Sequence, residues 1–341
     1  MTRTTIAVSL GCPSGIGPEV AVAAAARAGE EIRPLLVGDP DVVRRAARVV
    51  GVDVGRVQEV EAEAGVHALW PGEIGVWAQS RRMAHLPVYG APDREAGAAQ
   101  LAWINEALGL VQSGLASALV TGPVSKLAIA TSGAPGAKRF RGHTEHLAER
   151  LEAAEVVMAF HAENITTALV TTHLPLARVP EAITEEAVAR ASYWLVRLVR
   201  KLGKVRPHVA VAALNPHAGE GGLLGDEETR TITPGIARAM ARLEAEGVLA
   251  ELEGPIGAET AFRKHATGAF DGVVAMYHDQ ATIPCKMVGF GEAVNVTLGL
   301  PVIRTSVDHG TGHDIAGKGV ADPQGMARAM ELAVRLARAR A

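Results

Sequence analysis

Short apolar runs rich in β-branched residues alternate with alanine-rich stretches of helical periodicity along nearly the whole chain. This alternation predicts strands separated by helices, and such units form a mainly parallel sheet with helices on both faces. The chain is therefore expected to be an α/β protein. The expected strands begin at Thr5, Pro34, Ser117, Val156, Thr166, His208, Gly272 and Ala293, and the expected helices cover residues 18–28, 93–113, 181–202, 227–246 and 322–340.

The 341 residues suffice for one large or two medium-sized domains with well-buried cores. The chain contains no internal repeat, low-complexity tract or long flexible linker. We therefore expect two α/β/α domains that share a largely parallel sheet, with the chain crossing between them more than once. The expected first domain comprises residues 1–137 and 292–341, and the second comprises residues 138–291.

Composition argues against several classes of protein. The net charge is −3 with both signs interspersed, and aromatic residues are 4%, so no basic stripe or stacking motif indicates nucleic acid. The apolar run near the N-terminus is too short for a secretory signal, and no run has the roughly 18 apolar residues of a membrane span. Cys12 and Cys285 match neither a disulfide framework nor a CxxC motif, and Cys285 is expected to be a small buried apolar residue. We expect a cytoplasmic protein without nucleic-acid or membrane partners.

Three histidines, His173, His217 and His278, each follow a strand-like apolar run. In a parallel sheet the loops after the strands meet at one edge, where open α/β sheets bind their ligands. Imidazole is the commonest protein metal ligand, and three neutral rings leave the full charge of a divalent ion free to polarise a substrate oxygen. The repeated context favours a catalytic metal site over the alternative that each histidine only caps a turn or bonds a carbonyl.

A glycine-rich segment, GCPSGIGPE, follows the first expected strand and contains Gly11, Gly15 and Gly17. Such glycines allow backbone amides to approach an anionic ligand at a helix N-terminus. The spacing is not GxGxxG, and no acidic residue closes a second strand, so a Rossmann dinucleotide site is not indicated. A binding loop and a tight strand-to-helix turn are both compatible with this segment.

Polar motifs follow other strands or open other helices. TGPVSK follows the expected strand at Ser117, and GHTE, with His143 and Thr144, opens a helix. Thr144 is expected at the N-cap, whereas His143 and the amides beside it are candidates for binding an anionic substrate group. The acidic, glycine-rich segment after His217 is either a loop that closes over a substrate or a solvent-exposed turn.

The segment from Met276 to Gly319 contains three further candidates, Lys286, Asn295 and Arg304. The planar fork of arginine suits phosphate or carboxylate. A surface ion pair is the alternative explanation for Lys286. Asn295 and Arg304 lie inside apolar runs, where an unpaired polar group is costly, so binding roles are favoured for both.

The motifs GIGPE, TGPVSK, GHTE, TTHLPL, LNPHAGEGG, MYHDQ and VNVTLGLPVIRTSVDHGT occur in order between Gly11 and Gly319. Over this span, almost the entire chain, the sequence closely resembles the 4-hydroxythreonine-4-phosphate dehydrogenase family of pyridoxal phosphate biosynthesis. The resemblance implies an isocitrate/isopropylmalate-dehydrogenase-like fold, which binds NAD without a Rossmann fingerprint. It also implies a homodimer with each active site in an interdomain cleft at the subunit interface.

By the same resemblance, His173, His217 and His278 hold one divalent ion, with ligands drawn from both subunits. Zinc, magnesium, manganese and cobalt are all acceptable to such ligands. NAD is the implied coenzyme, NADP is the alternative, and no coenzyme-binding residue is assigned. The implied substrate contacts are His143, Thr144, Lys286, Asn295 and Arg304.

The implied reaction is the oxidation of 4-phosphooxy-L-threonine to a 3-oxo acid, which decarboxylates to 3-amino-2-oxopropyl phosphate. Asp279 adjoins a predicted metal ligand and is expected to orient that ligand or to transfer a proton, and Lys286 is the alternative base. A metal-dependent hydrolase and a non-catalytic protein that binds a phosphorylated metabolite are alternatives from other classes.

Two segments depart from the usual pattern of the family. Cys12 stands where the family usually has Asp, and the usual DHGTAL reads DHGTGHD, with His313 and Asp314. The second departure resembles relatives that oxidise phosphorylated sugar acids or ring dihydrodiols. A dehydrogenase of 4-phospho-D-threonate or erythronate, or of a cyclohexadiene diol carboxylate, is therefore the alternative within the same class.

Overall fold

The computed structural model describes residues 3–289 and 291–339, and it divides the chain into two compact units. Unit 1 comprises the chain up to Glu152 together with Leu300–Arg338, and unit 2 comprises Ala153–Gly299. The chain therefore crosses between units at 152/153 and 299/300. Both crossings lie further along the chain than the expected 137/138 and 291/292.

Two long-range contacts explain where the crossings lie. Helix α6 (His143–Arg150) belongs to unit 1 because its His146 hydrogen-bonds Asn105 of that unit. Strand β11 (Val294–Leu298) belongs to unit 2 because it pairs antiparallel with β6 (Val157–Ala162). Neither contact is visible in local periodicity.

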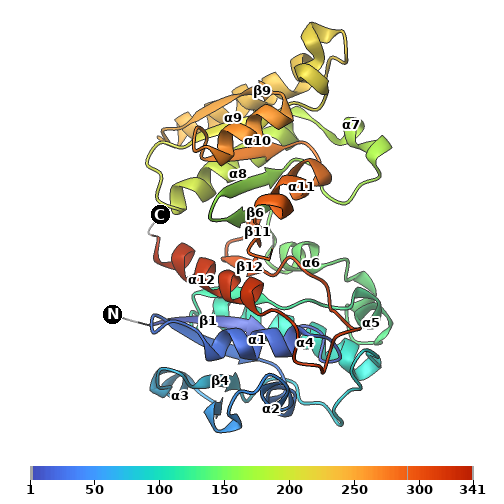
Figure 1. Ribbon diagram of the computed structural model, residues 1–341, viewed down its shortest axis with the longest axis vertical. Helices are drawn as coiled ribbons and strands as arrows, with labels where there is room; N and C mark the ends of the chain where they lie inside the picture. Colours follow the sequence, from blue (N-terminus) through green and yellow to red (C-terminus); the bar gives the residue numbers. More distant parts are fainter. Residues whose placement is uncertain (1–2, 290, 340–341) are drawn as a thin grey trace. The chain divides into compact units, whose positions relative to one another are not determined.

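Unit 1 is built on a parallel sheet. Its strands are β1 (Thr4–Ser9), β2 (Ile32–Val37), β3 (Val57–Val60), β4 (Ile74–Trp77), β5 (Ala118–Thr121) and β12 (Arg304–Ser306), and its helices include α1 (Gly17–Ala26), α2 (Pro40–Val49), α3 (Glu63–Ala68), α4 (Arg94–Gln112), α5 (Lys126–Thr131), α6 and α12 (Gln324–Arg338). The strand order is β3-β4-β2-β1-β5-β12, and these neighbours pair in parallel. Helix α1 packs against α12 and α4 against α5, and both α4 and α12 contact β1 and β5 (Figure 1).

Unit 2 has a mixed sheet that is parallel over most of its width. Its strands are β6, β7 (Ile165–Leu169), β8 (His208–Ala212), β9 (Glu251–Ile256), β10 (Gly272–Ala275) and β11, and its helices include α7 (Val179–Ala182), α8 (Glu185–Lys201), α9 (Thr233–Ala245), α10 (Ala258–Ala266) and α11 (His278–Val288). In the order β11-β6-β7-β10-β8-β9, β6 runs antiparallel to both neighbours and the other pairs are parallel. Only residues 163 and 164 separate β6 from β7, and so short a connection can form only an antiparallel hairpin.

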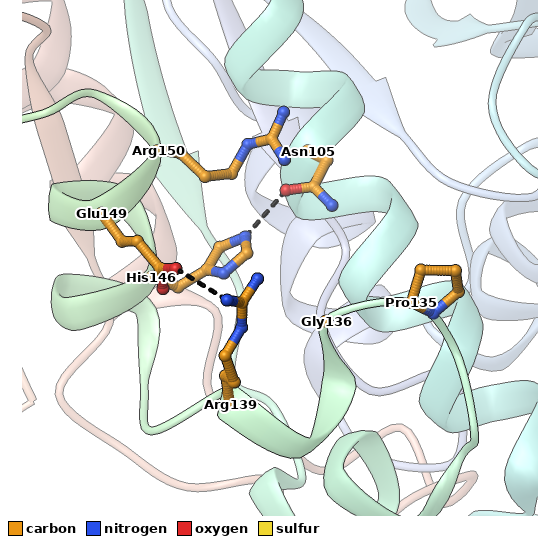
Figure 2. Close-up of a pocket in the computed structure, with 7 residues that line it drawn as sticks. All are labelled: Asn105, Pro135, Gly136, Arg139, His146, Glu149 and Arg150. Atoms are coloured by element: carbon orange, nitrogen blue, oxygen red, sulfur yellow. Dashed lines mark hydrogen bonds and ion pairs between the residues drawn. The ribbon is translucent and has the colours of Figure 1, made fainter.

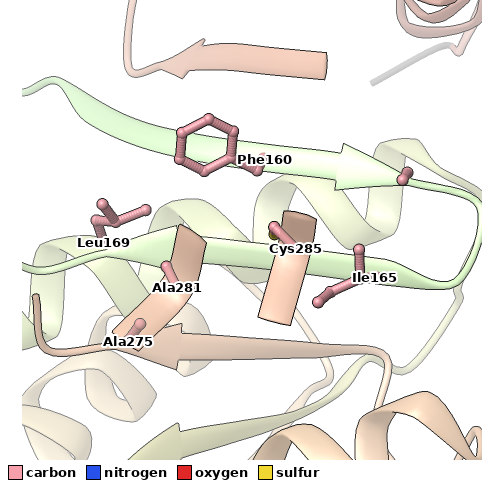
Figure 3. Packing of buried hydrophobic residues seen from close by; sticks show 7 residues of the cluster. Phe160, Ile165, Leu169, Ala275, Ala281 and Cys285 are labelled. Atoms are coloured by element: carbon pink, nitrogen blue, oxygen red, sulfur yellow. The ribbon is translucent and has the colours of Figure 1, made fainter. Parts of the chain in front are cut away.

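Strand β10 shows how unit 2 forms three layers. A Cβ on Gly272 would lie 3.3 Å from a methyl group of Leu195 on α8. Val273 packs in a cluster with α10, and Ala275 packs in one with α11 (Figure 3). Because alternate residues of a strand face opposite sides, α8 covers one face and α10 and α11 cover the other. Cys285 of α11 is 1% exposed within this cluster, which confirms its expected role as a buried apolar residue.

All the expected strands and long helices are present, with ends shifted by a few residues. The short strands β3, β4, β9 and β12 were not expected from the sequence. β3 and β9 stand at the ends of the strand order, and β9 reads as half-exposed and polar because an edge strand needs no continuous apolar run. No helix within residues 3–289 and 291–339 is long and apolar enough to cross a membrane.

Candidate active site

The three strand-end histidines follow neighbouring strands of unit 2. His173 lies after β7, His278 begins α11 after β10, and His217 lies in the turn segment η4 (Pro216–Gly222) after β8. Because β10 pairs in parallel with both β7 and β8, the carboxyl ends of all three strands are adjacent. The ring centroids of His173 and His278 are 5.4 Å apart. Within the described part of a single chain, no group of three or more His, Cys, Asp or Glu side chains is placed to hold a metal, so the structure assembles this pair of rings but not the full set.

Asp279 contacts one member of the histidine pair. His278 Nδ1 lies 2.7 Å from Asp279 Oδ1. An ionised carboxylate only accepts, so Nδ1 donates its hydrogen and the lone pair of the ring is on Nε2. This is the arrangement by which a carboxylate usually orients a metal-binding histidine.

Helix α11 is anchored on one side and carries candidate residues on the other. Ala281 and Cys285 pack against Phe160 of β6 and the neighbouring strands (Figure 3). Lys286, the next residue, is exposed. The packing therefore determines which side of α11 carries Lys286.

The backbone of η4 is left-handed over several consecutive residues. His217 has φ 52° and Ala218 has φ 53°, in a region that costs a non-glycine residue about 1–2 kcal/mol. The buried carboxylate of Glu228 accepts hydrogen bonds from the amides of Leu214 and Asn215, at 2.9 and 2.8 Å, and so holds the start of the turn. Strain that the surroundings maintain is typical of functional sites, which favours a role for this segment beyond that of a solvent-exposed turn.

In unit 1, Arg304 is a buried cation. It begins β12 and is 4% exposed. Its Nη2 and Nε donate to Thr121 Oγ1, at 2.7 and 3.2 Å, because β12 pairs with β5, which ends at Thr121. Burial lowers the pKa of Arg304 to about 10, so the guanidinium is charged at neutral pH. Thr121 was not among the predicted site residues, although a hydroxyl at a strand end, opening the TGPVSK motif, was a usable signal.

His143 lies close to this cation. Its Nε2 is shielded from solvent and has no hydrogen-bond partner within residues 3–289 and 291–339. Burial, and then the positive charge of Arg304, hold the pKa of His143 well below its ordinary value, so the ring is neutral at pH 7. A neutral imidazole with an unsatisfied buried nitrogen beside a guanidinium can accept or donate to a polar or anionic ligand.

Thr144 does not cap helix α6. The N-cap is Gly142, and helical geometry begins at His143, so Thr144 lies inside the first turn. The expectation of an N-cap at Thr144 is wrong because the helix begins two residues earlier than the polar pattern indicates. The helix cap therefore does not account for the threonine.

The candidate residues fall into two groups. His143, Thr144 and Arg304 belong to unit 1, whereas His173, His217, His278, Asp279, Lys286 and Asn295 belong to unit 2. Asn295 lies half-buried on β11. The buried guanidinium thus belongs to unit 1, and the three strand-end histidines belong to unit 2.

The glycine-rich segment after β1 forms a tight turn. A Cβ on Gly11 would collide with the carbonyl of Pro123, and one on Gly15 would collide with the carbonyl of Thr311. The amide of Ile16 donates to Thr311 O at 2.9 Å, and the segment is buried throughout. Close backbone packing therefore explains these glycines, and this favours the turn over a ligand-binding loop.

Residues 30–333 match the family model described as pyridoxal phosphate biosynthetic protein PdxA. The chain belongs to the PdxA family. Among curated relatives, a 4-hydroxythreonine-4-phosphate dehydrogenase of Desulfosudis oleivorans is 42% identical over 335 residues, which cover 97% of this chain and 96% of that protein. The family predicted from the motifs is confirmed.

Solved structures agree with membership of the PdxA family. The 4-hydroxythreonine-4-phosphate dehydrogenase of Klebsiella pneumoniae has a TM-score of 0.84 at 34% identity, with 99% of this chain and 100% of that chain covered. This confirms the predicted fold class. A terephthalate 1,2-cis-dihydrodiol dehydrogenase of Burkholderia xenovorans has a TM-score of 0.67 at 30% identity, with 98% of each chain covered.

The two departures from the usual PdxA-family pattern are in contact. Cys12 Sγ lies 3.6 Å from His313 Nε2, and Asp314 beside it is exposed. Burial raises the pKa of the Cys12 thiol to about 11, so the sulfur is protonated at neutral pH. A neutral thiol and an imidazole therefore stand together at the two positions that the sequence analysis singled out.

Proposed function

We propose that this PdxA-family chain is a dehydrogenase that oxidises 4-phosphooxy-L-threonine in pyridoxal phosphate biosynthesis. Bound NAD would supply the hydride acceptor for the carbinol carbon, and the hydroxyl proton would pass to a base. The 3-oxo acid then loses carbon dioxide to give 3-amino-2-oxopropyl phosphate. The observation that carries the proposal is the pair of imidazoles, His173 and His278, at adjacent strand ends in a chain whose relatives bear this enzyme's name.

His173, His217 and His278 are the proposed ligands of one divalent ion. The donor set fits, because Asp279 engages Nδ1 of His278 and the lone pair on Nε2 is oriented away from that bond. When bound, the ion polarises the substrate hydroxyl and lowers its pKa. The proposed ion is zinc, magnesium, manganese or cobalt, and among these the imidazole nitrogens favour zinc over magnesium, which prefers oxygen ligands.

Arg304, His143 and Thr144 are the proposed contacts to the anionic part of the substrate in unit 1. The guanidinium is held in place by Thr121, so it loses little freedom when it binds a phosphate or carboxylate. The unsatisfied Nε2 of His143 gains a partner when a ligand binds. These residues contribute mainly by orientation, which can supply much of the rate enhancement.

Lys286 and Asn295 complete the proposed substrate contacts. Asp279 is engaged by His278, so we assign it a positioning role, and Lys286 is the proposed acceptor of the hydroxyl proton, a role that its amine can fill only in the neutral form. NAD is the proposed coenzyme and the homodimer the proposed active form. Cys12 and Cys285 are both buried, and the cytoplasm is the proposed location.

A second candidate function is the oxidation of a phosphorylated sugar acid or of a cyclohexadiene diol carboxylate. The contact between Cys12 and His313 favours it, because it replaces the family's usual carboxylate. The structural likeness to a terephthalate 1,2-cis-dihydrodiol dehydrogenase gives this candidate a known relative. The chemistry at the metal would be the same in either case.

An assay of NAD reduction with a small substrate panel tests the proposal. We expect NADH to appear with 4-phosphooxy-L-threonine, to be abolished by a chelator and to return when a divalent ion is added. Turnover of 4-phospho-D-threonate or a dihydrodiol carboxylate, without turnover of 4-phosphooxy-L-threonine, would select the second candidate. Product formation without NAD would indicate a hydrolase, and metal-free protein that binds the substrate unchanged would indicate a binding protein.

A further inference from the structure

A pocket of about 370 Å³ lies in unit 1 beside helix α6 (Figure 2). We propose that it is a second ligand site, for the phosphate group of a small metabolite. The proposal does not depend on the proposed function, because the proposed substrate contacts are not among the pocket's lining residues. These are Asn105, Pro135, Gly136, Arg139, His146, Glu149 and Arg150.

The charges that face the pocket leave it positive. Arg139 and Arg150 supply two guanidinium groups, and Glu149 supplies the one carboxylate. The Arg139 and Glu149 side chains are 77% and 58% exposed and approach only to 3.7 Å, so this ion pair is weak and can open. Arg150 has neither an ion pair nor a hydrogen bond with any residue in the described ranges. An anion would therefore gain two partners and displace at most one.

The remaining polar group of the pocket is ordered. His146 Nε2 donates to Asn105 Oδ1 at 2.8 Å, so its Nδ1 is the ring acceptor. Burial, and then the charge of Arg150, lower the pKa of His146, so the ring is neutral at pH 7. A phosphate hydroxyl can donate to Nδ1 while the guanidinium forks bind the other oxygens, as arginine commonly does with phosphate.

The size of the pocket favours a phosphorylated metabolite over a bare ion. Small-molecule sites usually enclose about 300–1,000 Å³, and this pocket falls within that range. The exposed Pro135 and Gly136 leave the rim free of bulky side chains on one side (Figure 2). The phosphate would lie at the arginines and the rest of the ligand toward this rim.

The pocket is also connected to the candidate active site. The ring of Phe140 lies 5.4 Å from that of His146 and 6.1 Å from that of His143. Both histidines lie on α6, three residues apart. A ligand that contacts His146 would thus bind to the same helix that presents His143.

Calorimetric titration with inorganic phosphate and with glycerol 3-phosphate, at constant ionic strength, tests the proposal. The double variant Arg139→Gln/Arg150→Gln should weaken binding by about tenfold or more, because both charge-assisted hydrogen bonds to the phosphate are lost. The matched control is Lys138→Gln/Arg141→Gln, which removes two exposed charges from the same segment without altering the pocket lining. If phosphate also binds at the proposed substrate site, the titration should show a second binding event. Arg304→Gln should remove this event, and neither double variant should.

NMR of the histidine side chains in the wild-type protein measures the pKa of His146 directly. A variant, His146→Gln, is needed only to assign its signal. Bound phosphate should raise the pKa of His146, because a negative charge stabilises the imidazolium. Phosphate that leaves His146 unmoved, or an arginine double variant that binds like wild type, would overturn the proposal. Equal weakening of phosphate binding in the Lys138→Gln/Arg141→Gln control would also overturn it, because it would indicate general attraction of the anion to a positive surface. Absence of NAD reduction would count against the proposed function but not against this pocket.

Discussion

Arg304 shows how much a single side chain depends on partners far away in sequence. Its guanidinium is held by Thr121, which is 183 residues away. The apolar run around Arg304 predicts that the charge needs a partner, since an unpaired buried charge is costly. Which partner it finds follows only from the pairing of β12 with β5.

Replacing Thr121 with valine should lower the free energy of unfolding by about 1–3 kcal/mol, because two donors of a buried cation lose an acceptor. Urea unfolding measures the change. Thr121→Ser keeps the hydroxyl and should retain most of the stability. A valine variant as stable as wild type would mean that Thr121 does not support Arg304.

Replacing His217 with alanine should abolish turnover and leave the fold largely intact. The side chain is a proposed metal ligand, whereas the turn is held by Glu228 through backbone amides. NAD reduction and circular dichroism measure the two effects. His67→Ala, at an exposed histidine of α3, is the control, and a fully active His217 variant would refute the metal assignment.

At the scale of elements, close packing decides what local sequence leaves open. The segment GCPSGIGPE allows a ligand loop or a turn, and contact with the Pro123 and Thr311 carbonyls favours the turn. Likewise, the two runs around residues 157–169 read as strands, and their antiparallel pairing follows from the two-residue connection. Strand positions follow from periodicity, but partners and directions follow from connections and packing.

Replacing Gly15 with alanine should destabilise the protein by about 1–3 kcal/mol, because the new methyl group collides with the rigid carbonyl of Thr311. The matched control is Gly109→Ala in helix α4, where a Cβ meets no atom within 4 Å. That change should stabilise the protein by up to about 1 kcal/mol through helix propensity. Thermal or urea unfolding of both variants measures the contrast, and equal effects would contradict it.

The contact between α10 and β7 should make stability depend on pH. His265 Nε2 accepts from the Thr166 amide at 2.8 Å, and Nδ1 lies 2.7 Å from the Phe270 carbonyl, so only the neutral ring satisfies both. Burial lowers the pKa of His265 in the folded state below its ordinary value of 6.5.

The unfolded chain therefore binds the proton more readily than the folded one, so the stabilisation is complete above about pH 6.5 and is lost as pH falls through the lowered pKa. Unfolding free energies across this window measure the slope. His265→Gln should be less stable at pH 7 but should show a shallower slope, and an unchanged slope would exclude His265 as the source.

At the scale of the whole molecule, the proposed homodimer means that each active site needs residues from two chains. If metal ligands come from both subunits, specific activity should fall on dilution below the dimer dissociation constant. Light scattering after size-exclusion chromatography measures the oligomeric state at the concentrations of the assay, and NAD reduction measures the specific activity of the same samples. Full activity of a demonstrated monomer would contradict the proposed shared site.

The sequence alone determined the α/β class, the position of most strands and long helices, the family and the three strand-end histidines. These properties depend on periodicity and on residues within one motif. Tertiary structure decided that β7, β10 and β8 are neighbours, that His173 and His278 lie side by side, and that Cys12, 301 residues from His313, contacts it. Such contacts arise from strand order and burial, which join residues with no local relation in the chain.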